Sequence, residues 1–170
     1  MDTFIQQIIQ YHCPRWNELP QLDLYIDQVV LYLQAQLSLF DSDNTITPAM
    51  INNYVKQKIV MPPMKKKYAR EHMAYFFIIF TMKRLMNISQ LGTIIEGMKQ
   101  LYSLEQIYDL FCEELEYALK STFAPAKNPP RSFDADEKKE VSVLRSMTNT
   151  FAQMILTDQL VSQQQNKDGC

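Results

Sequence analysis

Glycine is unusually scarce in this chain. Only 3 of its 170 residues are glycine, whereas an average protein has roughly 7% glycine. Glycine supplies backbone with positive φ and lets the chain approach a phosphate closely, so Rossmann folds, phosphate-loop enzymes and small β-barrels depend on it. A chain so poor in glycine is therefore expected to be built from packed helices. Its hydrophobic content of 46% is enough for a core without a metal or a disulfide.

Helical periodicity extends along nearly the whole sequence. Apolar residues recur three and four positions apart, which is the spacing of amphipathic helices. Thr47-Pro48 is typical of a helix start, and residues 103–106 have the pattern of a capping box. The sequence predicts a helix that begins after Ser103 and further helices at about 3–12, 21–38, 48–57, 70–86 and 137–162.

Three segments are predicted to lie outside helices. Residues 41–44 are a cluster of turn formers, and residues 59–64 contain two prolines and suit an edge strand or an extended loop. Residues 121–136 have the composition of a linker, and the polar tail 163–170 is expected to be flexible.

The cysteines and the most apolar segment both favour a cytoplasmic protein. Cys13, Cys112 and Cys170 form neither a metal-binding pair nor an even disulfide framework, and the N-terminus lacks the features of a signal peptide. Residues 73–82 are apolar apart from Thr81, but this length is about half of what a bilayer-spanning helix needs. We therefore expect a buried helix there and no membrane partner.

Charge is divided unevenly along the chain. Residues 1–55 have one basic and six acidic residues, a net charge of −5, whereas residues 56–84 have eight basic residues and one acidic residue, a net charge of +7. The overall net charge of −2 hides this difference. A basic segment of this density attracts polyanions, of which nucleic acid is the commonest in cells. A solvated charged loop explains a bare run of three lysines equally well.

The helix predicted at 48–57 has two different faces. The apolar side chains, which should point inward, are those of Met50, Ile51, Tyr54 and Val55. The opposite face is small, amide-bearing and cationic, with Ala49, Asn52, Asn53 and Lys56. Asparagine can pair with the edge of adenine in the major groove, and lysine suits guanine or phosphate. A basic loop follows, so the order of elements predicts a winged helix-turn-helix.

This pattern resembles the head domain of the MerR-type transcription regulators. That family has a recognition helix that ends in a tyrosine, a proline eight residues later and a basic wing that contains a tyrosine. Tyr54, Pro62 and Tyr68 occupy these places, with Lys65, Lys66 and Lys67 in the wing. The resemblance also implies a fourth helix capped by Ser89, with Leu91, Ile94 and Ile95 packed inward.

The chain departs from the MerR pattern at several places. Asn52 and Asn53 stand where that family has an arginine and a tyrosine, and Lys58 and Lys67 stand where it has glycine. A longer loop, at about 39–46, replaces the tight turn between the first two helices. These lysines enrich the basic wing at positions where the family relies on glycine for its turn geometry.

A closer resemblance is to a bacterial group known only as domain of unknown function 1836. Three runs of sequence carry it, at residues 22–29 (Leu-Asp-Leu-Tyr-Ile-Asp-Gln-Val), 50–56 (Met-Ile-Asn-Asn-Tyr-Val-Lys) and 65–72 (Lys-Lys-Lys-Tyr-Ala-Arg-Glu-His). That group has no assigned activity, so the resemblance implies a fold and little more.

These expectations combine into an all-α protein that has a MerR-like winged helix-turn-helix head. An N-terminal helical segment (1–20) precedes the head (21–100), and a helical dimerisation or effector module (101–162) and a flexible tail (163–170) follow. The expected function is that of a DNA-binding transcription regulator, with helix 48–57 in the major groove and the wing, residues 62–70, on phosphates. The expected partners are double-stranded DNA, a second copy of the chain and a small-molecule effector. The residues expected to contact DNA are Thr47, Asn52, Asn53, Tyr54, Lys56, Lys58, Lys65, Lys66, Lys67, Tyr68 and Arg70.

Other interpretations stay open at this point. The same scaffold could serve as a protein-interaction module that does not bind DNA, and the module at 101–162 could be a helix hairpin that closes the core of a single domain. An enzyme is the least favoured class, because His12-Cys13 lacks a third group to orient the base. Met98 stands where a phosphate loop starting at Gly92 would need lysine. We expect no cofactor and no metal, and we expect the acidic run Glu113, Glu114 and Glu116 to be a solvated face.

Overall fold

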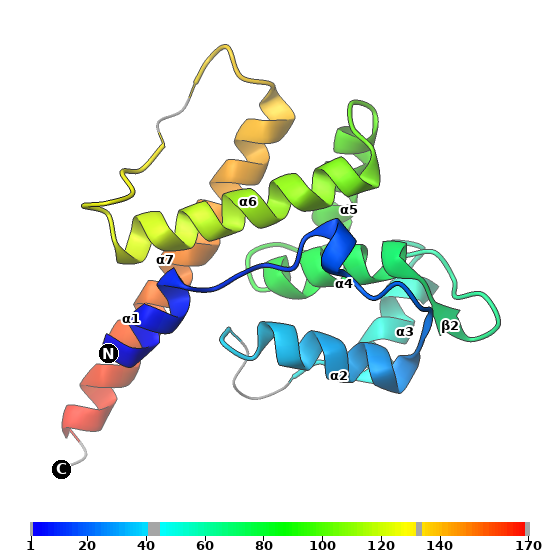
Figure 1. The fold of residues 1–170 in the computed structure, drawn as a ribbon, viewed down its shortest axis with the longest axis horizontal. Coiled ribbons are helices and arrows are strands. Elements are labelled where there is room, and N and C mark those ends of the chain that lie inside the picture. Colours follow the sequence, from blue (N-terminus) through cyan, green and yellow to red (C-terminus); the bar gives the residue numbers. More distant parts are fainter. Residues whose placement is uncertain (1, 41–44, 132–133, 169–170) are drawn as a thin grey trace. The chain divides into compact units, whose positions relative to one another are not determined.

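The computed structural model describes residues 2–40, 45–131 and 134–168. The turn expected at 41–44 lies outside these residues. Within them the protein is mostly helical, with seven α-helices and one two-stranded antiparallel sheet (Figure 1). The chain divides into two compact units, one formed by residues 1–13 and 113–170 and the other by residues 14–112.

The unit of residues 14–112 is a helical bundle with α4 in its core. Its helices are α2 (Ile26–Leu37), α3 (Pro48–Lys56), α4 (Arg70–Met82), α5 (Ile88–Lys99) and the first part of α6 (Leu104–Phe123) (Figure 1). All residues of α4 from His72 to Met82 are buried, which confirms that the apolar run is a core helix. α2 packs against both α3 and α4.

The sheet joins the segment just before α2 to the basic segment of residues 62–70, which is called the wing below. β1 (Leu24–Tyr25) runs antiparallel to β2 (Lys67–Tyr68), with Leu24 opposite Tyr68 and Tyr25 opposite Lys67. Met64 makes a further antiparallel bridge with Lys67. The prediction of a helix from residue 21 was wrong, because the first residues of that segment pair with the wing and α2 begins only at residue 26. The prediction of a helical protein is confirmed in its main part, and this two-stranded sheet is the addition that an all-α chain would lack.

Two capping predictions had different outcomes. Ser103 forms the expected capping box with Gln106, whose N–H donates to Ser103 Oγ at 3.2 Å while its Oε1 accepts from Ser103 N at 2.9 Å. Ser89 is not the cap of α5. Asn87 takes that role two residues earlier, since its Oδ1 accepts a hydrogen bond from Gln90 N at 2.9 Å.

The unit of residues 1–13 and 113–170 is also helical. It contains α1 (Asp2–Ile9), the part of α6 from residue 113 onward, and α7 (Lys139–Asp168). A short 3-10 turn (Trp16–Glu18) follows α1 in the chain and belongs to the other unit. Phe4 of α1 contacts Phe123 of α6 edge to face, with 6.0 Å between ring centroids. α7 continues past the predicted end at 162. No helix in the described parts of the chain is both long and apolar enough to cross a membrane.

Candidate nucleic-acid interface

The outer face of α3 carries the amide and basic side chains that the sequence predicted. Thr47 caps the helix, since its Oγ1 accepts a hydrogen bond from Met50 N at 3.4 Å, and proline occupies the first turn. Ile51 and Tyr54 are buried, whereas Asn52, Asn53 and Lys56 are exposed. The helix therefore presents three polar side chains to solvent from one rigid element.

Lys58 ends α3 in a backbone conformation that usually belongs to glycine. Its φ is 60°. Its N–H donates to the carbonyl of Val55 at 2.9 Å, and the next N–H, of Ile59, donates to the carbonyl of Tyr54 at 3.1 Å. This pair of hydrogen bonds is a Schellman motif, in which the left-handed residue is most often glycine. Lys58 thus has the backbone geometry that is usual for glycine although it carries a long side chain.

Lys65 and Lys66 form the tip of the wing in the same left-handed region. Their φ values are 48° and 63°. Met64 and Lys67 flank them and exchange two backbone hydrogen bonds, of 3.1 and 2.8 Å. A two-residue turn with both φ values positive has the form of a type I′ hairpin turn, for which Asn-Gly is the preferred sequence. Both lysines are exposed. Lys67, which the resemblance to MerR-type regulators aligned with a glycine, does not have a positive φ.

The two predicted tyrosines support the site from within. Tyr54 is 7% exposed and packs against Phe80 with 5.5 Å between ring centroids, and Tyr68 is 3% exposed and packs against Phe76 at 5.7 Å. Burial raises the pKa of both phenols above the ordinary value of 10.0. Their rings therefore anchor α3 and the wing to α4 instead of facing the solvent.

Two basic side chains of the wing lie over aromatic rings. Lys67 Nζ is 5.0 Å from the centroid of the Tyr25 ring, and the Arg70 guanidinium carbon is 5.8 Å from that of Trp16. Trp16 is itself held by a 2.7 Å hydrogen bond from its backbone N–H to Asp109 Oδ1. These cation–π contacts orient both charges on the surface.

His72 connects the two ends of the wing. It is 5% exposed, its Nδ1 accepts a hydrogen bond from Ala69 N at 2.9 Å, and its Nε2 lies 3.4 Å from the carbonyl oxygen of Pro62. Since Nδ1 accepts, the neutral tautomer carries its proton on Nε2, which can donate to Pro62. His72 therefore caps α4 and holds the wing closed at its base.

All the residues that were expected to contact DNA lie in the unit of residues 14–112. α3 and β2 both pack close to α2, and only a short segment of chain joins α3 to the wing. Helical periodicity did not predict that Tyr25 and Met64 are exposed next to the basic residues. Tyr25 fitted the apolar pattern of a helix, and Met64 lies in a segment without helical periodicity. The pairing of Tyr25 with Lys67 depends on tertiary structure and left no signal in the sequence.

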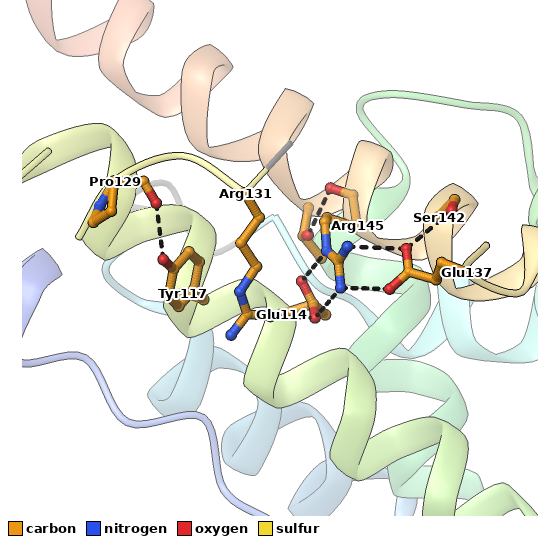
Figure 2. A network of polar contacts seen from close by, with 8 residues as sticks. Glu114, Tyr117, Pro129, Arg131, Glu137, Ser142 and Arg145 are labelled. Atoms are coloured by element: carbon orange, nitrogen blue, oxygen red, sulfur yellow. Dashed lines mark hydrogen bonds and ion pairs between the residues drawn. The ribbon is translucent and has the colours of Figure 1, made fainter. Parts of the chain in front are cut away.

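The sequence predicted that the acidic run Glu113, Glu114 and Glu116 in α6 is a solvated face, but one of these residues is buried. Glu114 is 4% exposed and is bound by Arg145, whose Nε and Nη2 lie 3.1 and 3.2 Å from its oxygens, and by Arg131, whose Nη1 lies 2.6 Å away (Figure 2). Hydrogen bonding to Glu114 raises the pKa of Arg145. Glu114 follows Phe111 by three positions, so helical periodicity could have predicted that it lies on the buried face of α6.

A groove of about 440 Å³ lies beside this network. It is lined by residues with polar or charged side chains, mainly from α7: Arg131, Glu137, Ser142, Arg145, Ser146, Asn149, Thr150 and Gln153. Arg145 is already engaged by Glu114 and by Glu137, at 2.8 Å. Among the described residues, no group of three His, Cys, Asp or Glu side chains could hold a metal ion.

A comparison with known families finds a match over the unit that contains the candidate interface. Residues 14–121 match the family described as Domain of unknown function (DUF1836). The chain belongs to the DUF1836 family. The DUF1836 match contains the whole unit of residues 14–112, with its wing and α3, and ends near the end of α6. No curated protein and no solved structure was found to match the chain.

Proposed function

We propose that this protein is a DNA-binding transcription regulator with a MerR-like winged helix-turn-helix head. α3 would enter the major groove, where Asn52 and Asn53 can pair with adenine edges and Lys56 with guanine or phosphate. The wing would lie on the phosphate backbone. Tyr54 and Tyr68 would hold these two elements in place from the core.

The observation that carries the proposal is the backbone of Lys58, Lys65 and Lys66. These are the non-glycine residues with positive φ in the described parts of the chain. The left-handed conformation costs an ordinary residue roughly 1–2 kcal/mol, and glycine or asparagine would avoid much of this cost. All three lysines are exposed, so packing does not explain them. Backbone strain of this kind clusters at functional sites, and here it places ammonium groups where a polyanion could reach them.

The charges of the wing support a backbone-binding role. Lys65 and Lys66 extend into solvent at its tip, and Lys67 and Arg70 are half-buried and oriented by aromatic rings. In this proposal these four residues and Lys58 neutralise phosphates, and the Thr47 hydroxyl lies at the N-terminus of the recognition helix. Phosphate contacts of this kind fix the register of the protein on the duplex, and base contacts supply the specificity.

The proposal also includes a homodimer and a small-molecule effector. One small head makes few base contacts, so useful specificity needs two heads on half-sites about one helical turn apart. The groove beside α7 is the place where an effector would bind.

A salt titration of duplex binding tests the proposal. A labelled duplex of random sequence is titrated with the full chain between about 50 and 200 mM salt, and the slope of log affinity against log salt is measured. Changing Lys65, Lys66 and Lys67 together to Ala should lower the slope by up to about three units, at roughly 0.9 per phosphate contact.

The matched control changes three exposed lysines of the other unit, Lys127, Lys138 and Lys139, to Ala. The control should keep the wild-type slope. Absence of duplex binding by the wild-type protein at low salt, or an equal effect of the two triple variants, would overturn the proposal.

A second candidate is a protein-interaction module on the same scaffold, with an acidic protein as its partner. It is favoured by exposed apolar side chains near the basic wing in sequence or on the segment that pairs with it. Met61, which directly precedes the wing, is 52% exposed, and Leu22, which precedes β1, is 81% exposed. Absence of duplex binding, together with a lysine-dependent complex with an acidic protein that survives nuclease treatment, would favour this second function.

A further inference from the structure

The outer face of the small sheet carries an aromatic ring, a cation and a thioether in one row. Tyr25 pairs with Lys67 on one side, and Met64 bridges to Lys67 on the other. Residues directly opposite each other on antiparallel strands point to the same face of a sheet. The row Tyr25–Lys67–Met64 therefore crosses three segments of chain side by side. The neighbouring row includes Tyr68, which turns to the opposite face and is buried.

The two apolar members of this row are unusually open to solvent. Tyr25 is 53% exposed and Met64 is 77% exposed. Hairpin turns normally carry polar residues next to their tips, and an exposed thioether at that position contributes nothing to the core. Lys67 Nζ lies 5.0 Å from the Tyr25 ring centroid, so the cation and the ring form one surface.

We propose that Tyr25 and Met64 extend the phosphate contact of Lys67, so that the row Tyr25–Lys67–Met64 packs along one sugar–phosphate strand of duplex DNA beside the contacts of Lys65 and Lys66. This inference rests on the proposed function. A DNA strand alternates anionic phosphates with deoxyribose rings whose carbon edges are apolar. The row alternates in the same way: Lys67 meets a phosphate, and the Tyr25 ring and Met64 cover the sugars on either side. The Tyr25 hydroxyl donates a hydrogen bond to a neighbouring phosphate oxygen, a contact that tyrosine commonly makes in protein–DNA complexes.

The charge of the surroundings favours this partner over an apolar one. Lys65 and Lys66 lie at the turn adjoining the row, so a purely apolar surface docked on Tyr25 and Met64 would bring these ammonium groups close to it without compensation. A sugar–phosphate strand supplies both the anions and the apolar area.

Neutral and charged contacts can be separated by their salt dependence. The double variant Tyr25→Ala/Met64→Ala should bind duplex about five- to tenfold more weakly, because it loses a hydrogen bond and apolar contact area. It should keep the wild-type slope of log affinity against log salt, since it removes no charge. Lys67→Ala should instead lower that slope by about 0.9. Tyr25→Phe should recover the part of the loss that comes from the ring.

The control is Leu31→Ala, which truncates another exposed apolar side chain, on α2, that is 66% exposed in the wild type. It should bind as the wild type does. Met64→Ala alone changes an exposed turn residue and tests the row even if Tyr25→Ala unfolds.

The outcomes distinguish this inference from the proposed function. Duplex binding with a lysine-dependent slope, combined with unchanged affinity of the Tyr25 and Met64 variants, would overturn the inference and leave the proposed function standing. Absence of any duplex binding by the wild-type chain would overturn both.

Discussion

Replacing Lys65-Lys66 by Asn-Gly should stabilise the unit of residues 14–112 and weaken the proposed binding to duplex DNA. Both lysines have positive φ, 48° and 63°, and each conformation costs roughly 1–2 kcal/mol for an ordinary residue. Asparagine relieves part of this strain and glycine relieves all of it. Glycine also lowers the free energy of unfolding by about 0.5–1 kcal/mol, because it raises the conformational entropy of the unfolded chain. The net gain should be about 1 kcal/mol.

Two measurements on the same variant check this prediction. In thermal unfolding the midpoint should rise by about 3 °C for a chain of this size. In duplex binding the salt slope should fall by about 1.8, because two phosphate contacts are lost.

The control variant Lys65→Ala/Lys66→Ala removes the same two charges but keeps a Cβ atom in the left-handed region. It should lose the same salt slope and gain no comparable stability. If Asn-Gly is less stable than the wild type, the strain argument is refuted. If Asn-Gly is more stable but binds duplex with an unchanged slope, the strained lysines do not serve DNA binding.

Two further predictions concern the buried polar groups. Arg145→Met should destabilise the unit of residues 1–13 and 113–170 by about 2–4 kcal/mol in denaturant unfolding, because it leaves the buried carboxylate of Glu114 with one partner. Arg131→Met replaces a side chain that is 42% exposed and should cost about 1 kcal/mol or less. Equal losses in the two variants would contradict the conclusion that Arg145 is the main partner of Glu114. Burial raises the pKa of Tyr54 and Tyr68, so the folded state holds their protons more tightly than the unfolded state does. Their contribution to stability should be full below about pH 10 and should be lost as the pH rises through the pKa values of the two phenols in the folded protein. Ultraviolet titration should show phenols that ionise late, and these should disappear in Tyr54→Phe and Tyr68→Phe.

Local patterns were sufficient to predict most of the helices. Met73 to Met82 form a core helix because an unbroken apolar run of that length can be satisfied only by burial. Thr47 and Ser103 cap helices because their hydroxyls satisfy N–H groups within the next turn, which is an interaction between near neighbours in sequence. The polar face of α3 follows from the same periodicity.

Predictions failed where the outcome depended on distant residues. Leu24 and Tyr25 have the spacing of a helix, but they pair with Lys67 and Tyr68, more than forty positions later. A single sequence contains no information on that register. The Ser89 prediction failed for a local reason instead: Asn87 and Gln90 exchange two hydrogen bonds in a capping box, which is a pattern between near neighbours that the sequence already contained.

Sequence alone determined that this chain is helical and that its basic residues are concentrated between residues 56 and 84, because composition and periodicity are local properties. Tertiary structure alone decided how those basic residues are presented. It places Lys58, Lys65 and Lys66 in left-handed backbone that no propensity favours for lysine, and it aligns Tyr25 and Met64 beside Lys67. Such strain persists only where hydrogen bonds from the surrounding fold, here the Schellman motif and the hairpin, over-determine the backbone.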